Sequence, residues 1–211
     1  ATAIDPASTA TIDVQGSGVG YAFRHADGSP ATADLVVGSG FTVNGIAAGS
    51  RGIQALTTGA VTSAATVNIL DAAGGAALIA GTASSVTNSG QLTSASLTAP
   101  VVDISNGQGT SFTNTGIVSA ASPQAVAIQG TGHSVVNLVG GSVTGDIVTS
   151  GGSSALRWTG GTLDGGATMG DGGSHTAYLH AVDTSHTWHL VAGGGHDNAL
   201  TFDNTQARGG S

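Results

Sequence analysis

Short units of alternating apolar and polar residues recur along the chain, and glycine or another turn residue follows each unit. One unit occupies residues 102–107, and a similar unit at 126–130 begins 24 positions later. Further on, Ile147 lies 19 positions beyond Ile128, and Met169 lies 22 positions beyond Ile147. Side chains that alternate with a period of two form strands with one buried face. The pattern therefore predicts many short strands separated by tight turns.

A second strand unit repeats in phase with the first. Residues 86–90 match residues 112–116 type by type, 26 positions apart, and residues 136–141 and 156–161 each end in Gly-Gly. One such coil cannot bury its inward side chains alone, but the coils above and below it can cover them. We therefore predict an all-β, right-handed parallel β-helix with 19–26 residues per coil. A β-sandwich is the rival architecture, and the match between successive coils favours the solenoid.

Domain organisation follows from how regularly this repeat continues. We expect residues 1–211 to form a single β-helical segment, of which residues 1–40 match the repeat least. Residues 175–211 contain denser strand signals and most of the histidines. Because the half-coil spacing of about ten residues persists there, we interpret this part as continued coiling with a different surface.

Composition supports strands and limits the classes of partner. The chain has 36 Gly, no Cys, 8% charged residues and a net charge of −8, and all its acidic residues are Asp and all its basic residues Arg. Scarcity of helix formers favours strand and turn. The negative charge disfavours nucleic acid as a partner. No apolar run has the length needed to span a bilayer, so we expect no direct membrane insertion.

Several stretches resemble a known family. They lie at residues 52–56, 86–90, 112–116, 140–147 and 193–202, and together they resemble the passenger domains of Gram-negative type V autotransporters of the pertactin-like kind. The resemblance implies export across the outer membrane and a place on the bacterial surface or outside the cell. It also implies that the β-helix is an adhesin or carries a separate functional module.

Two aspartates are the candidate catalytic pair. Asp103 and Asp146 each directly precede the inward Ile of their coil, so we expect them to face solvent in one column, two coils apart. That column would place them roughly 10 Å apart, near the separation used by inverting glycosidases. The alternative is that both are solvated aspartates on a strand face.

The other candidate groups also have structural interpretations. We expect the histidines to face solvent from strands, because none of the familiar metal-ligand spacings is present. Residues 193–197 resemble one imperfect copy of a calcium-binding nonapeptide, and we interpret them as a turn. The rings of Trp158 and Trp188 either stack on sugars or pack within the fold. The histidines in question are His175, His180, His186, His189 and His196.

These observations favour a non-catalytic adhesin or virulence passenger segment that acts through the lateral face of a rigid rod. The expected partner is a host-cell receptor, a glycan or another such rod between bacteria. We assign no catalytic, cofactor-binding or metal-binding residue and expect no cofactor. Two alternatives stay open: a polysaccharide-active enzyme using Asp103 and Asp146, and a structural stem for a module elsewhere in the chain.

Overall fold

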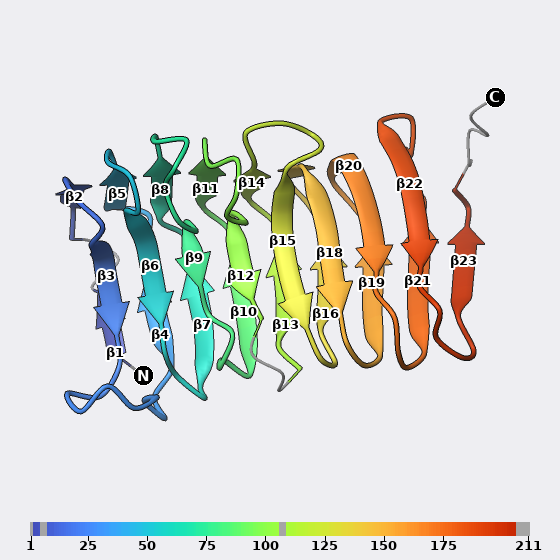
Figure 1. Cartoon of the computed structure of the whole chain (residues 1–211), viewed down its shortest axis with the longest axis horizontal. Helices are drawn as coiled ribbons and strands as arrows, with labels where there is room; N and C mark the ends of the chain where they lie inside the picture. The colour runs from blue at the N-terminus through green and yellow to red at the C-terminus, as the bar shows by residue number, and fades with distance from the viewer. Residues whose placement is uncertain (1, 5–7, 106–108, 206–211) are drawn as a thin grey trace.

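A computed structural model describes residues 2–4, 8–105 and 109–205, and shows them as strands and turns without a helix. The strands stack side by side into a rod, with the N-terminal coil at one end and the C-terminal strands at the other (Figure 1). All strand pairs are parallel, which confirms the predicted right-handed parallel β-helix. No helix in the described ranges is long and apolar enough to cross a membrane.

The rod has three faces, and each complete coil contributes one strand to each face in turn. Face A is a nine-stranded sheet that runs the whole length of the rod. Its strands are β1 (Thr2–Ile4), β4 (Leu35–Val37), β7 (Ala60–Ser63), β10 (Ser85–Asn88), β13 (Ser111–Asn114), β16 (Val135–Leu138), β19 (Ser154–Trp158), β21 (His175–His180) and β23 (Ala199–Asp203).

Faces B and C are joined into one sheet because β20 (Thr162–Met169) extends across the corner between them. The other strands of face B are β2 (Ala10–Val14), β5 (Phe41–Gly45), β8 (Thr66–Ile69), β11 (Gln91–Ser94), β14 (Ile117–Ser119) and β17 (Ser142–Thr144). The other strands of face C are β3 (Val19–Phe23), β6 (Arg51–Ala55), β9 (Leu78–Ile79), β12 (Val102–Ile104), β15 (Val126–Thr131), β18 (Asp146–Ser150) and β22 (Thr187–Ala192).

Buried side chains form straight columns inside the rod. Parallel pairing places residues of the same parity above one another, so an apolar position in one coil is covered by the equivalent position in the next. The longest column runs through face A, where every member is buried: Leu35, Val61, Val86, Phe112, Val136, Leu156 and Ala177. The core is therefore narrow and built mainly from aliphatic side chains.

The predicted register holds on face A. Val86 pairs with Phe112, 26 positions later, and Val136 pairs with Leu156, 20 positions later. The step from Thr2 to its partner Leu35 is longer, at 33 residues. Extra residues lie in the connections between strands, because the inward and outward positions of the strands themselves must stay aligned.

Two predicted registers on face C are wrong. Val102 pairs with Ile128 and not with Val126, so the step is 26 residues instead of the expected 24. Ile147 pairs with Ala167 and not with Met169. The register shifts between Val126 and Ile128, where β15 carries a bulge, and a two-residue shift keeps the same alternation. Alternation alone therefore could not distinguish the two pairings.

The corner between faces A and B is held by buried asparagines. Asn88 and Asn114 lie above one another in adjacent coils, and the Asn88 Nδ2 donates to the Asn114 Oδ1 at 2.8 Å. The Asn114 Nδ2 donates to the Gly116 carbonyl at 3.0 Å, and the Gly90 N–H donates to the Asn88 Oδ1 at 3.2 Å. Both side chains are fully buried. This asparagine ladder satisfies polar groups that the tight corner would otherwise leave unpaired.

Glycine is required at the same corner because successive coils approach closely. A Cβ on Gly116 would collide with the backbone of Gly90, and one on Gly141 would collide with Gly116. Gly141 also has a positive φ of 66°, which L-residues with side chains rarely adopt. The recurrent glycines of the sequence repeat thus mark backbone contacts between coils.

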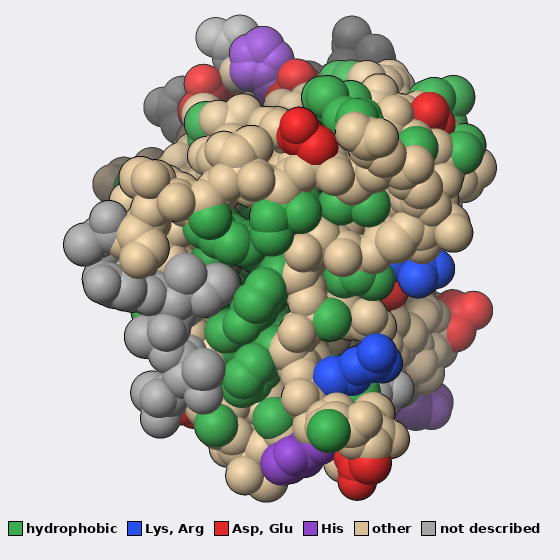
Figure 2. Space-filling model, turned by 90° about the vertical axis from the view of Figure 1, so that its left-hand side faces the viewer, with side chains coloured by type: hydrophobic (Ala, Val, Ile, Leu, Met, Phe, Trp, Pro, Cys, Tyr) green, Lys and Arg blue, Asp and Glu red, His purple; other side chains and the backbone are tan. Residues whose placement is uncertain are grey.

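The two ends of the rod expose apolar side chains. Figure 2 looks onto the end formed by the first coil and shows apolar side chains gathered at its middle, with charged side chains nearer the edge. At the opposite end, every residue of β23 is exposed, including Leu200 and Phe202. These two residues continue columns that are buried further inside, so the end of the core is open there.

Candidate functional site

Face B stops before the other two faces do, and a hollow lies where its next strand would stand. Within the described ranges, β20 is the last strand on face B, and the chain leaves β21 through residues 181–186 without forming another. The hollow beside this connection has a volume of about 340 Å³. It is lined by Thr144, Thr162, Leu163, Asp164, Asp183 and His186.

Strands and a turn supply the two sides of this hollow. Thr144 on β17 and Asp164 on β20 are paired neighbours that point outward from face B. Asp183 and His186 come from the connection on the opposite side. The carboxylates accept hydrogen bonds, while hydroxyl and imidazole groups donate or accept them, and the lining contains no Arg or Lys. The arrangement suits a ligand rich in hydroxyl groups better than an anion.

An exposed tryptophan stands beside the same connection. The Trp188 side chain on β22 is 45% exposed, and it lines a second hollow of about 170 Å³. Thr184 and Thr187 line this second hollow, so residues 183–187 lie between it and the first. Aromatic faces pack well against the apolar faces of sugar rings. The two hollows together therefore place hydrogen-bonding groups next to an aromatic surface.

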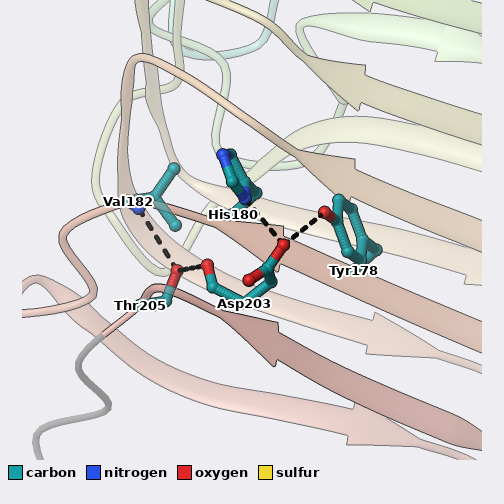
Figure 3. Close-up of polar contacts among 5 residues, drawn as sticks. All are labelled: Tyr178, His180, Val182, Asp203 and Thr205. Atoms are coloured by element: carbon teal, nitrogen blue, oxygen red, sulfur yellow. Dashed lines mark hydrogen bonds and ion pairs between the residues drawn. The ribbon is translucent and has the colours of Figure 1, made fainter.

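A third feature lies on face A, where β21 and β23 hold an exposed polar cluster (Figure 3). The Asp203 Oδ2 accepts hydrogen bonds from the Tyr178 hydroxyl at 3.1 Å and from the His180 Nδ1 at 3.0 Å. The rings of Tyr178 and His180 are stacked, with centroids 6.3 Å apart. The hydrogen bonds from His180, and then from Tyr178, hold the pKa of Asp203 below its ordinary value. The same carboxylate raises the pKa of the Tyr178 hydroxyl.

This cluster makes a testable prediction about ionisation. Replacing His180 with Ala should raise the pKa of Asp203 towards its ordinary range, and Tyr178→Phe should raise it less, since the His180 hydrogen bond has the larger effect. Because the pKa of Asp203 is lowered in the folded chain, its stabilising contribution is present above the ordinary carboxyl range and is lost as pH falls through the lowered value. A pH titration of the carboxyl carbon by NMR measures both effects.

Asp27 is the internal control for that titration. Its pKa is also lowered, chiefly by the side-chain and backbone hydrogen bonds from Ser29 in its own turn. It lies in the first coil, far from β23, so neither substitution should move it. An equal change at Asp27 and Asp203 would mean that the substitutions act through global unfolding and not through the local hydrogen bonds.

The structure does not place Asp103 and Asp146 in the predicted column. Asp103 pairs with Gln129, which in turn pairs with Val148, whereas Asp146 pairs with Val126. Each carboxylate accepts a backbone hydrogen bond, from the Ser105 N–H at 2.9 Å and from the Gly166 N–H at 2.7 Å respectively. The shared column was wrong because the face C register is shifted, and both groups serve as backbone acceptors.

The histidines do not behave as one set. His175 is 1% exposed, contrary to the expectation that it faces solvent, and its Nδ1 lies 2.9 Å from the Ser154 hydroxyl. Its Nε2 is buried without a partner among the described residues. His189 lies 3.2 Å from the Thr168 hydroxyl, and His180 pairs with Asp203. The described residues contain no group of three or more metal-ligating side chains.

The remaining candidates separate clearly. Trp158 is completely buried, so its ring packs within the fold and is closed to ligands, whereas Trp188 is accessible. Residues 193–197 form a turn in which the Gly194 N–H donates to the Asp171 carboxylate at 2.7 Å.

Sequence reasoning overlooked Asp164, Asp183, Tyr178 and Asp203. Asp164 occupies an outward strand position like many others, and no local signal shows that face B lacks its next strand. Tyr178 and Asp203 are 25 residues apart, close to one repeat period, so the period itself could have brought them together.

Comparisons of the chain with protein-family models, with curated proteins and with solved structures find no match.

Proposed function

We propose that this chain is a surface-exposed or secreted adhesin segment of the autotransporter-passenger kind, which binds a neutral glycan beside residues 181–188. The parallel β-solenoid fold supports the resemblance, because such passengers are β-helical. The observation that carries the proposal is the pairing of the carboxylate-lined hollow with the exposed ring of Trp188. Both lie on the side of a rigid rod, where an extended partner can reach them.

The mechanism is equilibrium binding. Asp164 and Asp183 accept hydrogen bonds from sugar hydroxyls, Thr144 and Thr162 add hydroxyl groups, and Trp188 packs against a neighbouring ring. Backbone pairing on both sides of β20 fixes the strand wall of the hollow. Little ordering is then needed on binding, which favours affinity.

Glycan-panel binding of the labelled chain, followed by titration of any ligand found, tests this function. Trp188→Ala should weaken binding about 10-fold or more, because a lost aromatic contact is worth about one power of ten in affinity. Asp164→Asn should also weaken it, since the amide nitrogen cannot accept a hydrogen bond from a sugar hydroxyl.

The double variant D103N/D146N is the matched control. It removes the same number of carboxylates or more from the lateral surface, but at positions outside the hollow. It should bind like the unaltered chain. Glycan cleavage that this double variant abolishes would instead support the enzymatic alternative, and absence of saturable binding by the unaltered chain would contradict the adhesin proposal.

A further inference from the structure

The exposed C-terminal end of the rod has the properties of an unfinished core. β23 is the last strand of face A and β22 the last of face C, so their outer edges are unpaired within the described ranges. Leu200 and Phe202 follow Ala177 and Leu179 in their columns, yet they are 50% and 42% exposed. An exposed strand edge with apolar side chains is a template for a further strand.

An apolar hollow opens at this same end. It has a volume of about 120 Å³, and its polar surface is small. Its lining includes Met169 and Leu190, which are the last core positions of face C, together with Leu200 of face A. The hollow is therefore the top of the core, left without the side chains of a following coil.

The N-terminal end presents the matching feature. Strands β1, β2 and β3 have unpaired outer edges, and apolar side chains gather between them (Figure 2). Tyr21 and Phe23 on β3, with Ile12 on β2, are only partly buried against the core. Tyr21 heads the column of face C that ends at Leu190, and Phe23 heads the column that ends at Ala192.

We propose that a second copy of this chain is the occupant, and that the N-terminal end of one rod docks onto the C-terminal end of the next. In this arrangement β3 pairs with β22 of the neighbouring rod and β1 pairs with β23. Tyr21 then covers Leu190, and Phe23 covers Ala192. The contact is heterologous, so it repeats at every free end and generates longer rods.

Strand direction favours this orientation over the others. Every pair along the rod is parallel, so a rod stacked N-terminal end on C-terminal end continues each ladder in the same direction and the same rotational sense. Two C-terminal ends placed face to face would set their strands antiparallel and reverse the order of the three faces. Only the head-to-tail contact therefore extends all the columns.

Charge is distributed in the same sense. Residues 175–205 contain Asp183, Asp197 and Asp203 and no Lys or Arg. Two of the four arginines of the chain, Arg24 and Arg51, lie in the first two coils. Opposite charges at the two ends favour the head-to-tail encounter and discourage contact between two acidic ends.

Sedimentation velocity over a range of concentrations, with negative-stain microscopy, tests this contact. The unaltered chain should form rods whose lengths are multiples of one rod. L200E should weaken association about 30-fold or more, as expected for a charge placed at the centre of an interface. I117E is the matched control: Ile117 is also apolar and 42% exposed, but it lies on lateral face B, so association should be unchanged.

Mixing distinguishes a heterologous contact from a symmetric one. L200E blocks the C-terminal end and Y21E blocks the N-terminal end, so each variant alone should be monomeric. Their mixture should form dimers, because each variant retains the end that the other lacks. Circular dichroism and thermal unfolding verify that each variant is folded, and F202E and F23E replace any variant that is not.

Three results would overturn the proposal: monomers of the unaltered chain at every concentration, equal weakening by I117E, or no dimer on mixing folded L200E and Y21E. Glycan binding by L200E should persist, because the hollow lined by Asp164 and Asp183 does not include Leu200. The end-to-end contact and the proposed adhesive function can therefore fail independently.

Discussion

Replacing Trp158 with Ala should lower the free energy of unfolding by about 3–5 kcal/mol, the range measured for large aromatic side chains removed from cores. Trp158 is completely buried on β19, between Leu138 and Leu179 in the same column. Its indole N–H also donates to the Gly161 carbonyl at 3.3 Å. The narrow core is built from stacked side chains, so the coils on both sides cannot collapse into the space without breaking their backbone ladders.

Trp188→Ala provides the matched control, since the chemical change is identical and the side chain is 45% exposed. It should change the unfolding free energy by no more than about 1 kcal/mol, because most of its apolar surface is already in contact with water. Urea or guanidinium unfolding of both variants measures the difference. Similar losses in the two variants would contradict the burial that the structure gives to Trp158.

The second large effect is expected in the asparagine ladder. Asn114→Ala should destabilise the chain by about 2–3 kcal/mol, because it removes a buried acceptor and a buried donor together. The Asn88 Nδ2 then loses its shortest hydrogen bond, that of 2.8 Å, and keeps only longer ones to the carbonyls of Ile117 and Gly90. The loss falls on the corner where the glycines bring successive coils together.

Asn137→Ala is the control for the ladder. Asn137 lies on the next strand of face A, but its side chain points outward and donates to the hydroxyls of Ser111 and Thr113 at 3.2 and 3.3 Å. Since water can replace these partners, the expected loss is about 0.5 kcal/mol. Denaturant unfolding would contradict the ladder's role if Asn114→Ala cost no more than Asn137→Ala.

These two variants also bear on function. Both residues lie inside the rod and outside the two hollows, so they should affect binding only through folding. Trp188→Ala, in contrast, should affect binding with little change in stability. Comparing binding with unfolding for each variant therefore separates the structural positions from the ligand-binding ones.

Much of the fold could be predicted from local sequence alone. The match between residues 86–90 and 112–116 gives the register of face A correctly, because both the strand and its corner are repeated without insertion. Alternation also implies that Asn88 and Val86 point the same way, so the buried asparagine ladder follows once the strands are known.

The register on face C could not be predicted in the same way. Val102 has an apolar candidate partner both 24 and 26 positions later, and both choices keep its side chain inward. Pairing is decided by how many residues the turns and the bulge in β15 accommodate, which alternation does not record. The predicted Asp103 and Asp146 column failed for this reason.

The sequence by itself determined that this chain is an all-β parallel solenoid, because period-2 alternation and recurrent glycine corners leave few other ways to bury its small apolar side chains. Only the tertiary structure decided which coils pair, that His175 and Trp158 are enclosed, and that face B ends early beside Asp164 and Asp183. Those properties depend on which coil lies above each residue. Neighbours in space here are about one repeat apart in sequence, so local patterns cannot specify them.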